Sequence, residues 1–174
     1  MPPTPWQIKE QGKQKMIRSN IIASVGRTVL LSSAVMLAAH GTGHAQEAEI
    51  KAAIAANHAA IESLDVTKVD PLWVHDATVT LINPASKSIS VGWDAVRKAW
   101  AAQSDYLAAL KITQVDGPYI QVKGDIAWET GVALSAGKLK SGADFSRRVV
   151  EFDVFEKRDG KWLLVSHSAT RLPE

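Results

Sequence analysis

The stretch RVVEFDVFEKRDGKWLLVSHSAT, residues 148–170, holds two runs of alternating and β-branched residues on either side of Arg158-Asp159-Gly160-Lys161. Asp-Gly between two such runs is a strong short-range signal for a β-hairpin, because both positions favour the positive φ angles of a tight turn. The sequence therefore predicts a C-terminal hairpin, with strands over residues 147–157 and 162–170.

The chain before this hairpin supplies more strands and a set of helices. Strands are predicted over residues 77–82, 110–122 and 126–136, with residues 86–90 as a short mate of the first. Gly124-Asp125 makes a tight turn, and residues 138–143 make a looser one. Apolar residues at helical spacing predict helices over residues 47–64, 66–74 and 92–103. Helices gathered before an antiparallel sheet indicate an α+β fold.

The first 45 residues differ in character from the rest. Residues 28–39 (TVLLSSAVMLAA) form an apolar run with Arg18 and Arg27 before it and Gly43-His44-Ala45 after it. This is the pattern of a secretory signal peptide with cleavage after Ala45, and Met16 would then be the true start. The alternative is an uncleaved membrane anchor. The sequence thus predicts a secreted, periplasmic protein with one domain over residues 46–174.

Composition excludes several classes of protein. The 174 residues contain no cysteine, so disulfides and thiolate chemistry are absent. Residues 1–45 hold 5 of the 20 Lys and Arg residues and 1 of the 18 Asp and Glu residues, which leaves residues 46–174 with a formal net charge of −2. Nothing in this balance favours nucleic acid, or a membrane surface once the signal peptide is removed.

Several short motifs recur in an order typical of one family. They are Asp76-Ala77-Thr78-Val79, GWDAVRKAW from Gly92, Gly124-Asp125-Ile126-Ala127-Trp128, and Asp159-Gly160-Lys161-Trp162 followed by His167-Ser168. In this order the chain resembles the nuclear-transport-factor-two-like (NTF2-like) family of cone-shaped α+β domains, which includes SnoaL-like polyketide cyclases and ketosteroid isomerases. The resemblance implies a strongly curved, mainly antiparallel sheet, a cystatin-like roll, that wraps about three N-terminal helices around an apolar pocket.

The resemblance also implies where catalytic groups would lie. Ketosteroid isomerases use a strand aspartate as base, and a tyrosine with a protonated aspartic acid as the oxyanion hole. On this sequence the base position falls on Leu81, the tyrosine position on Asn57 and the second aspartate position on Asp153. Leucine cannot abstract a proton, so the match argues against steroid-type isomerisation by that mechanism.

Strand alternation places Glu151 and Asp153 on one face of residues 147–157, and Phe152 with other apolar residues on the opposite face. If Asp153 and Glu151 line the cone, the apolar outer face needs a partner, which predicts a homodimer through the sheet. The alternative is that the apolar residues face the helices and both acids are solvated.

His167 is the second candidate catalytic residue, placed by alternation with Leu163, Val165 and Ala169. A lone histidine on an apolar face is often a core residue, but the resemblance places this face toward the cone. An imidazole beside a carboxylate can move protons near neutral pH. We therefore expect His167 and Asp153 to approach each other across the pocket.

Tryptophans supply candidate pocket walls. Of five indoles after residue 45, Trp100 on a helix stripe and Trp128 on a strand face with Thr130 are the pocket candidates. Indole walls suit a flat apolar or aromatic ligand. Arg147-Arg148 is a candidate anion clamp, although paired arginines on a strand are more often surface charges.

Other chemistries find little support. His58, His75 and Asp76 would be the least unsuitable metal ligands, but they lack a short ligand spacing, so no metal is expected. No Gly-x-Ser-x-Gly elbow and no phosphate-binding glycine loop occurs, and no cofactor is expected. Two functions remain: a pocket for a small apolar or aromatic molecule, extended by weak cyclase-, isomerase- or hydratase-like chemistry, or a non-catalytic homodimeric association module.

Overall fold

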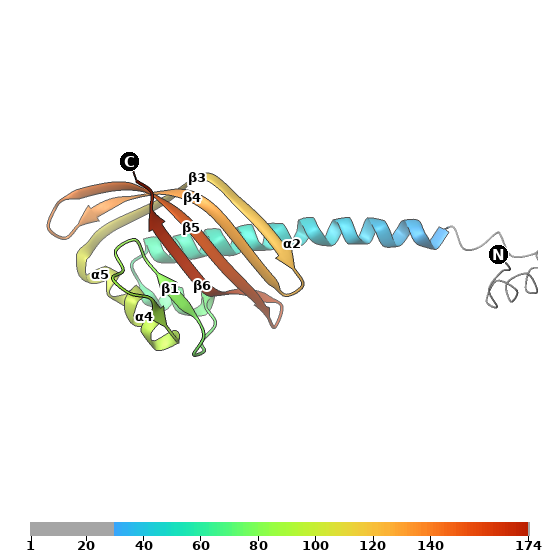
Figure 1. The fold of residues 1–174 in the computed structure, drawn as a ribbon, viewed down its shortest axis with the longest axis horizontal. Helices are drawn as coiled ribbons and strands as arrows, with labels where there is room; N and C mark the ends of the chain where they lie inside the picture. The colour runs from blue at the N-terminus through green and yellow to red at the C-terminus, as the bar shows by residue number, and fades with distance from the viewer. Residues whose placement is uncertain (1–29, 174) are drawn as a thin grey trace, which may run out of the picture. The chain divides into compact units, whose positions relative to one another are not determined.

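Four long antiparallel strands make up most of a curved six-stranded sheet in the computed structural model, which describes residues 30–173 (Figure 1). The sheet order is β2-β1-β6-β5-β4-β3, and only β1 and β6 run parallel. The strands are β1 (Thr80–Ile82), β2 (Ser90–Val91), β3 (Leu107–Lys123), β4 (Ile126–Leu139), β5 (Asp144–Arg158) and β6 (Lys161–Arg171). The predicted α+β class with a curved, unclosed and mainly antiparallel sheet is confirmed.

The hairpin predicted at Asp159-Gly160 is present between β5 and β6. Arg158 pairs with Lys161, and the two residues between them have φ angles of 50° and 77°. Positive φ at both central residues is what a tight two-residue hairpin needs. The turn at Gly124-Asp125 likewise joins β3 to β4, since Lys123 pairs with Ile126.

The helices differ from the predicted ones mainly at their ends. They are α2 (Leu30–Glu62), α3 (Val66–Val69), the 3-10 turn η1 (Asp70–Leu72), α4 (Trp93–Ala101) and α5 (Gln103–Tyr106). The prediction that the first helix starts at residue 47 was wrong, because α2 begins at Leu30. The helix predicted over 66–74 tightens into η1 at Pro71, where a helix interior would lose a backbone hydrogen bond.

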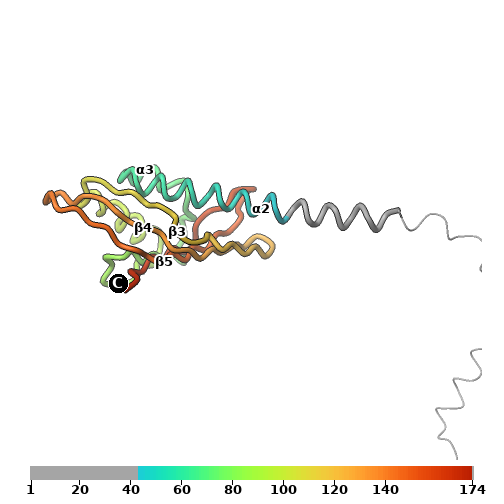
Figure 2. The backbone as a smooth tube through the Cα atoms, turned by 90° about the horizontal axis from the view of Figure 1, so that it is seen from above, coloured from blue at the N-terminus to red at the C-terminus, as the bar shows by residue number. Residues whose placement is uncertain are grey.

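From Gly41 on, the chain forms one compact unit. Helix α2 packs against one face of the sheet, here called the inner face (Figures 1 and 2). Two carboxylates on α2 fix it there: Glu62 accepts the backbone N–H of Ile112 on β3 at 2.8 Å, and Glu49 accepts the indole N–H of Trp162 on β6 at 3.0 Å. The helix therefore spans the sheet between β3 and β6.

A buried stripe on α2 faces the sheet. Ile50, Ile54, Asn57 and Ile61 repeat at intervals of three and four residues, and all four are buried. The amide of Asn57 thus stands where the pattern calls for an apolar side chain. Among residues 30–173, no helix combines the length and apolar character needed to cross a bilayer.

The shorter helices close one end of the sheet. On α4, Val96 and Trp100 are buried, and the Trp100 ring lies 6.4 Å from that of Trp73. The Arg97 guanidinium donates two hydrogen bonds to the carboxylate of Asp70, at 3.0 and 3.1 Å. This paired contact joins α4 to η1 and holds Trp100 over the inner face.

Candidate functional site

The inner face of β5 carries acidic side chains. Glu151 and Asp153 are buried there together with Val149 and Phe155, whereas Phe152 on the other face is 41% exposed. Alternation was therefore read correctly on this strand. The alternative, in which both acids are solvated and the apolar residues face the helices, is wrong.

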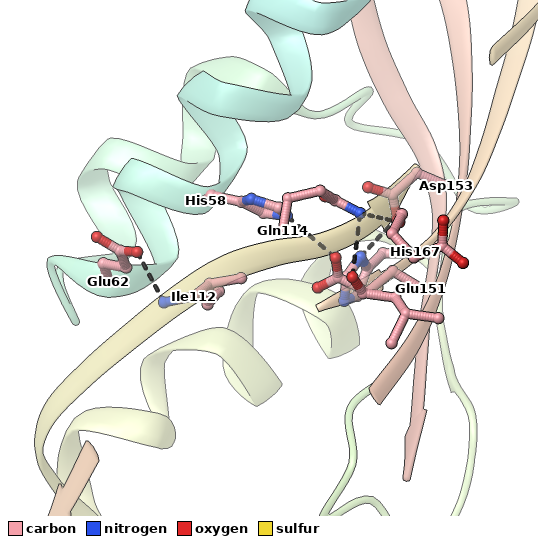
Figure 3. A network of polar contacts seen from close by, with 9 residues as sticks. His58, Glu62, Ile112, Gln114, Glu151, Asp153 and His167 are labelled. Atoms are coloured by element: carbon pink, nitrogen blue, oxygen red, sulfur yellow. Dashed lines mark hydrogen bonds and ion pairs between the residues drawn. The ribbon is translucent and has the colours of Figure 1, made fainter. Parts of the chain in front are cut away.

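Asp153 and His167 meet on this face, as expected. The two residues are directly opposed in the β5–β6 register, both are buried, and the Nδ1 atom of His167 lies 2.5 Å from Oδ1 of Asp153 (Figure 3). With Nδ1 held by a carboxylate, the Nε2 atom is the ring nitrogen left for another partner. The catalytic role of the two residues stays a prediction.

A β-bulge determines which residues share the face of His167. Val154 pairs with Ser166 but Phe155 pairs with Leu164, so Val165 is an extra residue on β6. The predicted neighbours Leu163 and Val165 were therefore wrong. Trp162 and Leu164 before the bulge, and Ala169 after it, are the residues buried on this face.

The charge of His167 is set by two opposing effects. Burial alone would lower the pKa of the imidazole, but the charge of Asp153 and its hydrogen bond raise it, with smaller contributions from Glu151 and Glu129. The net effect is a pKa above the ordinary value of 6.5. The protonated ring is therefore favoured in spite of complete enclosure.

Glu129 on β4 is a buried acid that the sequence analysis missed. It pairs directly with Asp153 across the sheet, and cross-strand partners share one face. Burial, followed by the charges of Asp153 and Glu151, raises the pKa of Glu129 to about 8. At neutral pH the group therefore carries a proton, and its buried Oε2 atom has no hydrogen-bond partner among the described residues.

Helix α2 adds two polar side chains above these acids. Asn57 is fully buried, and neither its amide nitrogen nor its oxygen has a protein partner in the described chain. The neighbouring His58 also reaches inward, with Nε2 3.2 Å from Oε2 of Glu151 (Figure 3). The pair is close, but its angles are not those of a hydrogen bond.

A cavity of about 50 Å³ opens between α4, α5 and the inner face. Its polar lining includes His167, Glu151 and Arg147, and its apolar lining includes Trp100 and Leu110. The Trp100 ring lies 5.5 Å from the imidazole of His167. Since one water needs roughly 10–15 Å³ of cavity volume, the cavity admits a few waters or the tip of a small ligand.

The structure brings some predicted pocket residues together and separates others. Trp100 and Glu151 line the cavity, whereas Asn57 and Leu81 are buried nearby in the interior. Leu81 lies beside His167 in the parallel β1–β6 register, so an apolar side chain stands at the implied base position.

The placement of Trp128 and Thr130 in the pocket was wrong. Because Glu129 faces inward, its two neighbours on β4 point to the opposite face, where Thr130 is exposed and Trp128 half-buried. Their cross-strand partners there are Val154 and Phe152. Glu129 itself pointed the other way, because an acidic side chain is normally expected to face water, so the sequence held no signal of this orientation.

The candidate metal ligands also stay apart. His58 approaches Glu151, whereas His75 stacks on Trp93 with ring centroids 4.1 Å apart and holds the backbone oxygen of Asp70. Within residues 30–173, no three His, Asp or Glu side chains are grouped so that they could hold a metal ion.

A curved sheet over a helix, with a polar cavity between them, defines the NTF2-like class of α+β domains. Similar solved structures include a candidate dehydratase of the NTF2-like family from Streptomyces avermitilis, at 21% identity and a TM-score of 0.67, covering 75% of this chain and 99% of that one. A ketosteroid isomerase-like protein from Erwinia carotovora atroseptica shows 18% identity, a TM-score of 0.62, and coverage of 73% and 96%.

A third similar structure is a candidate calcium/calmodulin-dependent protein kinase II association domain from Xanthomonas campestris, with 23% identity, a TM-score of 0.63, and coverage of 72% and 87%. At these identities the likeness concerns the fold alone. The model of the SnoaL-like domain family matches residues 50–171, so the chain belongs to that family. No curated protein matches the sequence.

Proposed function

We propose that this chain binds a small apolar or aromatic molecule at the inner face of its sheet and moves a proton on it through His167. The observation that carries the proposal is the buried Asp153–His167 pair beside a cavity that His167 itself lines. Buried polar groups with shifted pKa values in a concave site are typical of active sites.

The roles of the two side chains follow from their contact. Asp153 holds Nδ1 of His167 and stabilises the charged ring, so Nε2 is the atom that exchanges a proton with the ligand. A protonated Nε2 donates to an oxygen that leaves or gains charge, and a neutral Nε2 accepts a proton from carbon or water. Dehydration, cyclisation and double-bond isomerisation all use such steps.

The three inner carboxyl groups have different tasks in this scheme. Glu129 has a pKa of about 8 and is neutral near pH 7, so it leaves Asp153 as the charged partner of His167. Glu151 lines the cavity and faces His58. Since Leu81 cannot act as a base, the chemistry of this chain runs through His167.

Titration of the full chain with neutral planar aromatic compounds tests the proposal, with tryptophan fluorescence as the readout. Trp100 lines the cavity beside His167, so an occupying ligand should quench it in a saturable way. His167→Ala and Asp153→Asn should alter binding without unfolding the domain. A flat response of the wild-type chain to every compound contradicts the proposal.

A second candidate function is a non-catalytic, homodimeric association module that uses the outer face of the sheet. Phe152 and Tyr119 are exposed there on either side of Thr130, and Ile126, Trp128 and Val154 continue the same apolar surface. We call these five aromatic and aliphatic residues the outer patch. Contiguous exposed apolar surface favours a protein partner, and a second copy of this chain is the simplest one.

We also propose that the chain is exported and that residues 1–45 are removed. The apolar run and the small residues before Gln46 support this. Expression of the full chain with mass measurement of the exported product is the test. A mature N-terminus at Gln46 is expected, and an intact N-terminus on the exported protein contradicts it.

A further inference from the structure

Two arginines near the mouth of the cavity have no carboxylate partner among the described residues. Among the described residues, neither Arg147 on β5 nor Arg171 on β6 forms an ion pair with a carboxylate. The Nε atom of Arg147 is buried and has no hydrogen-bond partner in this part of the chain. Arg147 is half-buried, and a buried donor is normally hydrogen-bonded, so this Nε atom indicates a missing partner.

The strand register directs both arginines to the inner face. Arg171 is the cross-strand partner of Val149, and Arg147 precedes Val149 by two residues on the same face. Burial, and after it the charge of Arg171, lowers the pKa of the Arg147 guanidinium. The Phe145 ring lies 4.6 Å from the Arg147 guanidinium carbon and supports its plane.

A larger groove continues the cavity outward past these charges. This groove, of about 540 Å³, shares Ala85, Tyr106 and Arg147 with the inner cavity and is bordered beyond them by Arg171 and Phe145. Arg147 therefore separates the narrow end, where His167 lies, from the open end. A ligand that extends from the cavity into the groove lies beside the guanidinium.

We propose that Arg147 and Arg171 bind the carboxylate of a small organic acid whose apolar part enters the cavity beside His167. A planar guanidinium binds a carboxylate through two parallel hydrogen bonds, and a second positive charge strengthens the contact. This inference names the ligand class of the proposed site and rests on the proposed function.

Of the two residues in the candidate clamp Arg147-Arg148, only Arg147 faces the cavity. Arg148 follows Arg147 on β5 and is exposed on the outer face, so the adjacent pair cannot close on one anion. Arg171 takes its place from the neighbouring strand. Arg148 is therefore a matched control, with the same charge on the same strand but outside the site.

The test compares 3-phenylpropanoate with its neutral amide, 3-phenylpropanamide, by calorimetric titration of the full chain at pH 7 and low salt. We expect the wild-type chain to bind the carboxylate about tenfold or more tightly than the amide, the scale of a charge-assisted contact. Arg147→Gln and Arg171→Gln should each reduce this preference about tenfold, which brings the affinities for acid and amide together. Arg148→Gln should leave it intact.

The outcomes separate this inference from the proposed function. Equal binding of acid and amide, no binding of the acid, or a preference that survives in both Arg147→Gln and Arg171→Gln overturns the anion site. An equal loss in Arg148→Gln overturns it too, because the effect would then come from net charge. If the anion site fails, saturable binding of neutral aromatic compounds would still support ligand binding in the cavity. Loss of all binding in His167→Ala, but not in the arginine variants, would support the proposed role of His167 without supporting the anion site.

Discussion

The two faces of strands β4 and β5 depart from the usual arrangement of a half-buried sheet. On the inner face, Glu129, Glu151 and Asp153 are buried, while on the outer face Phe152 is 41% exposed and Trp128 is only half-buried. An antiparallel sheet normally turns apolar residues inward and polar ones to water. Three carboxyl groups enclosed beneath a helix cost free energy, and such a cost is expected where function rather than stability selects the residues.

The inner face should be the more sensitive of the two to loss of one partner. Asp153→Ala would leave the buried imidazole of His167 without its carboxylate, at a cost of about 3–5 kcal/mol in the free energy of unfolding. Urea denaturation followed by circular dichroism measures this. Asp153→Asn keeps an acceptor for Nδ1 and should cost less. A loss below about 1 kcal/mol in Asp153→Ala would show that the pair is not buried as described.

Glu129 on the inner face should make the folded chain less stable as pH rises. Its pKa is raised from 4.5 to about 8, so the folded chain keeps a proton that the unfolded chain has released between these pH values. The free energy of unfolding therefore falls from about pH 4.5 to pH 8 through this group. Glu129→Gln should remove that fall and gain on the order of 2 kcal/mol by pH 9.

Denaturation curves of the wild-type chain and Glu129→Gln at pH 5, 7 and 9 measure this difference. Asp105→Asn is the matched control, because its carboxylate is exposed. A stability difference that stays the same at all three pH values would contradict the protonated state of Glu129.

Substitutions on the outer face should change the association of two chains rather than the folding of one. Phe152→Asp places a charge in the outer patch and should weaken dimer formation about tenfold or more, the effect of a buried aromatic contact in an interface. Sedimentation equilibrium at several concentrations gives the dissociation constant. Ser88→Asp adds the same charge on an exposed loop and serves as the control. A wild-type chain that sediments as a monomer would leave the outer patch without its proposed partner.

The turn between β5 and β6 lies away from both faces, so a substitution there shows how much an ordinary backbone change costs in stability. Gly160 has a φ angle of 77°, with open space around its Cα, so Gly160→Ala should cost about 1 kcal/mol from the backbone alone. Thermal denaturation of Gly160→Ala beside Asp159→Asn, which tolerates the same conformation, measures it. An equal loss in both variants would point to a cause other than the φ angle of Gly160.

The sequence predicted the fold well because its signals were local. The two Gly- and Asp-containing turns, the β-branched runs and the helical spacing each depend on neighbouring residues, and the four long strands were predicted. The short β2 was predicted over residues 86–90 but lies at Ser90–Val91. The face of β5 was also correct, since the family resemblance placed Asp153 toward the cone and alternation then oriented its neighbours. The start of α2 was misplaced because Gly41 and Gly43 have low helix propensity, yet the helix runs through them.

The candidate site was harder to predict because it depends on pairing between strands. Glu129 was missed, and Trp128 and Thr130 were misplaced, because the loose turn before β5 leaves the β4–β5 register open. The bulge at Val165 changes which residues of β6 face inward, and no feature of the sequence predicts it. That Arg147 and Arg171 lie on the same face likewise appears only once the strands are aligned.

The central claim is that Asp153 determines the charge of His167 on the inner face. NMR titration of the imidazole of His167, assigned among the five histidines by comparison with His167→Gln, measures its pKa directly. The account predicts a value above 6.5 in the wild-type chain that falls below 6.5 in Asp153→Asn, where burial is no longer opposed by the carboxylate. A value that is the same in both chains would contradict it.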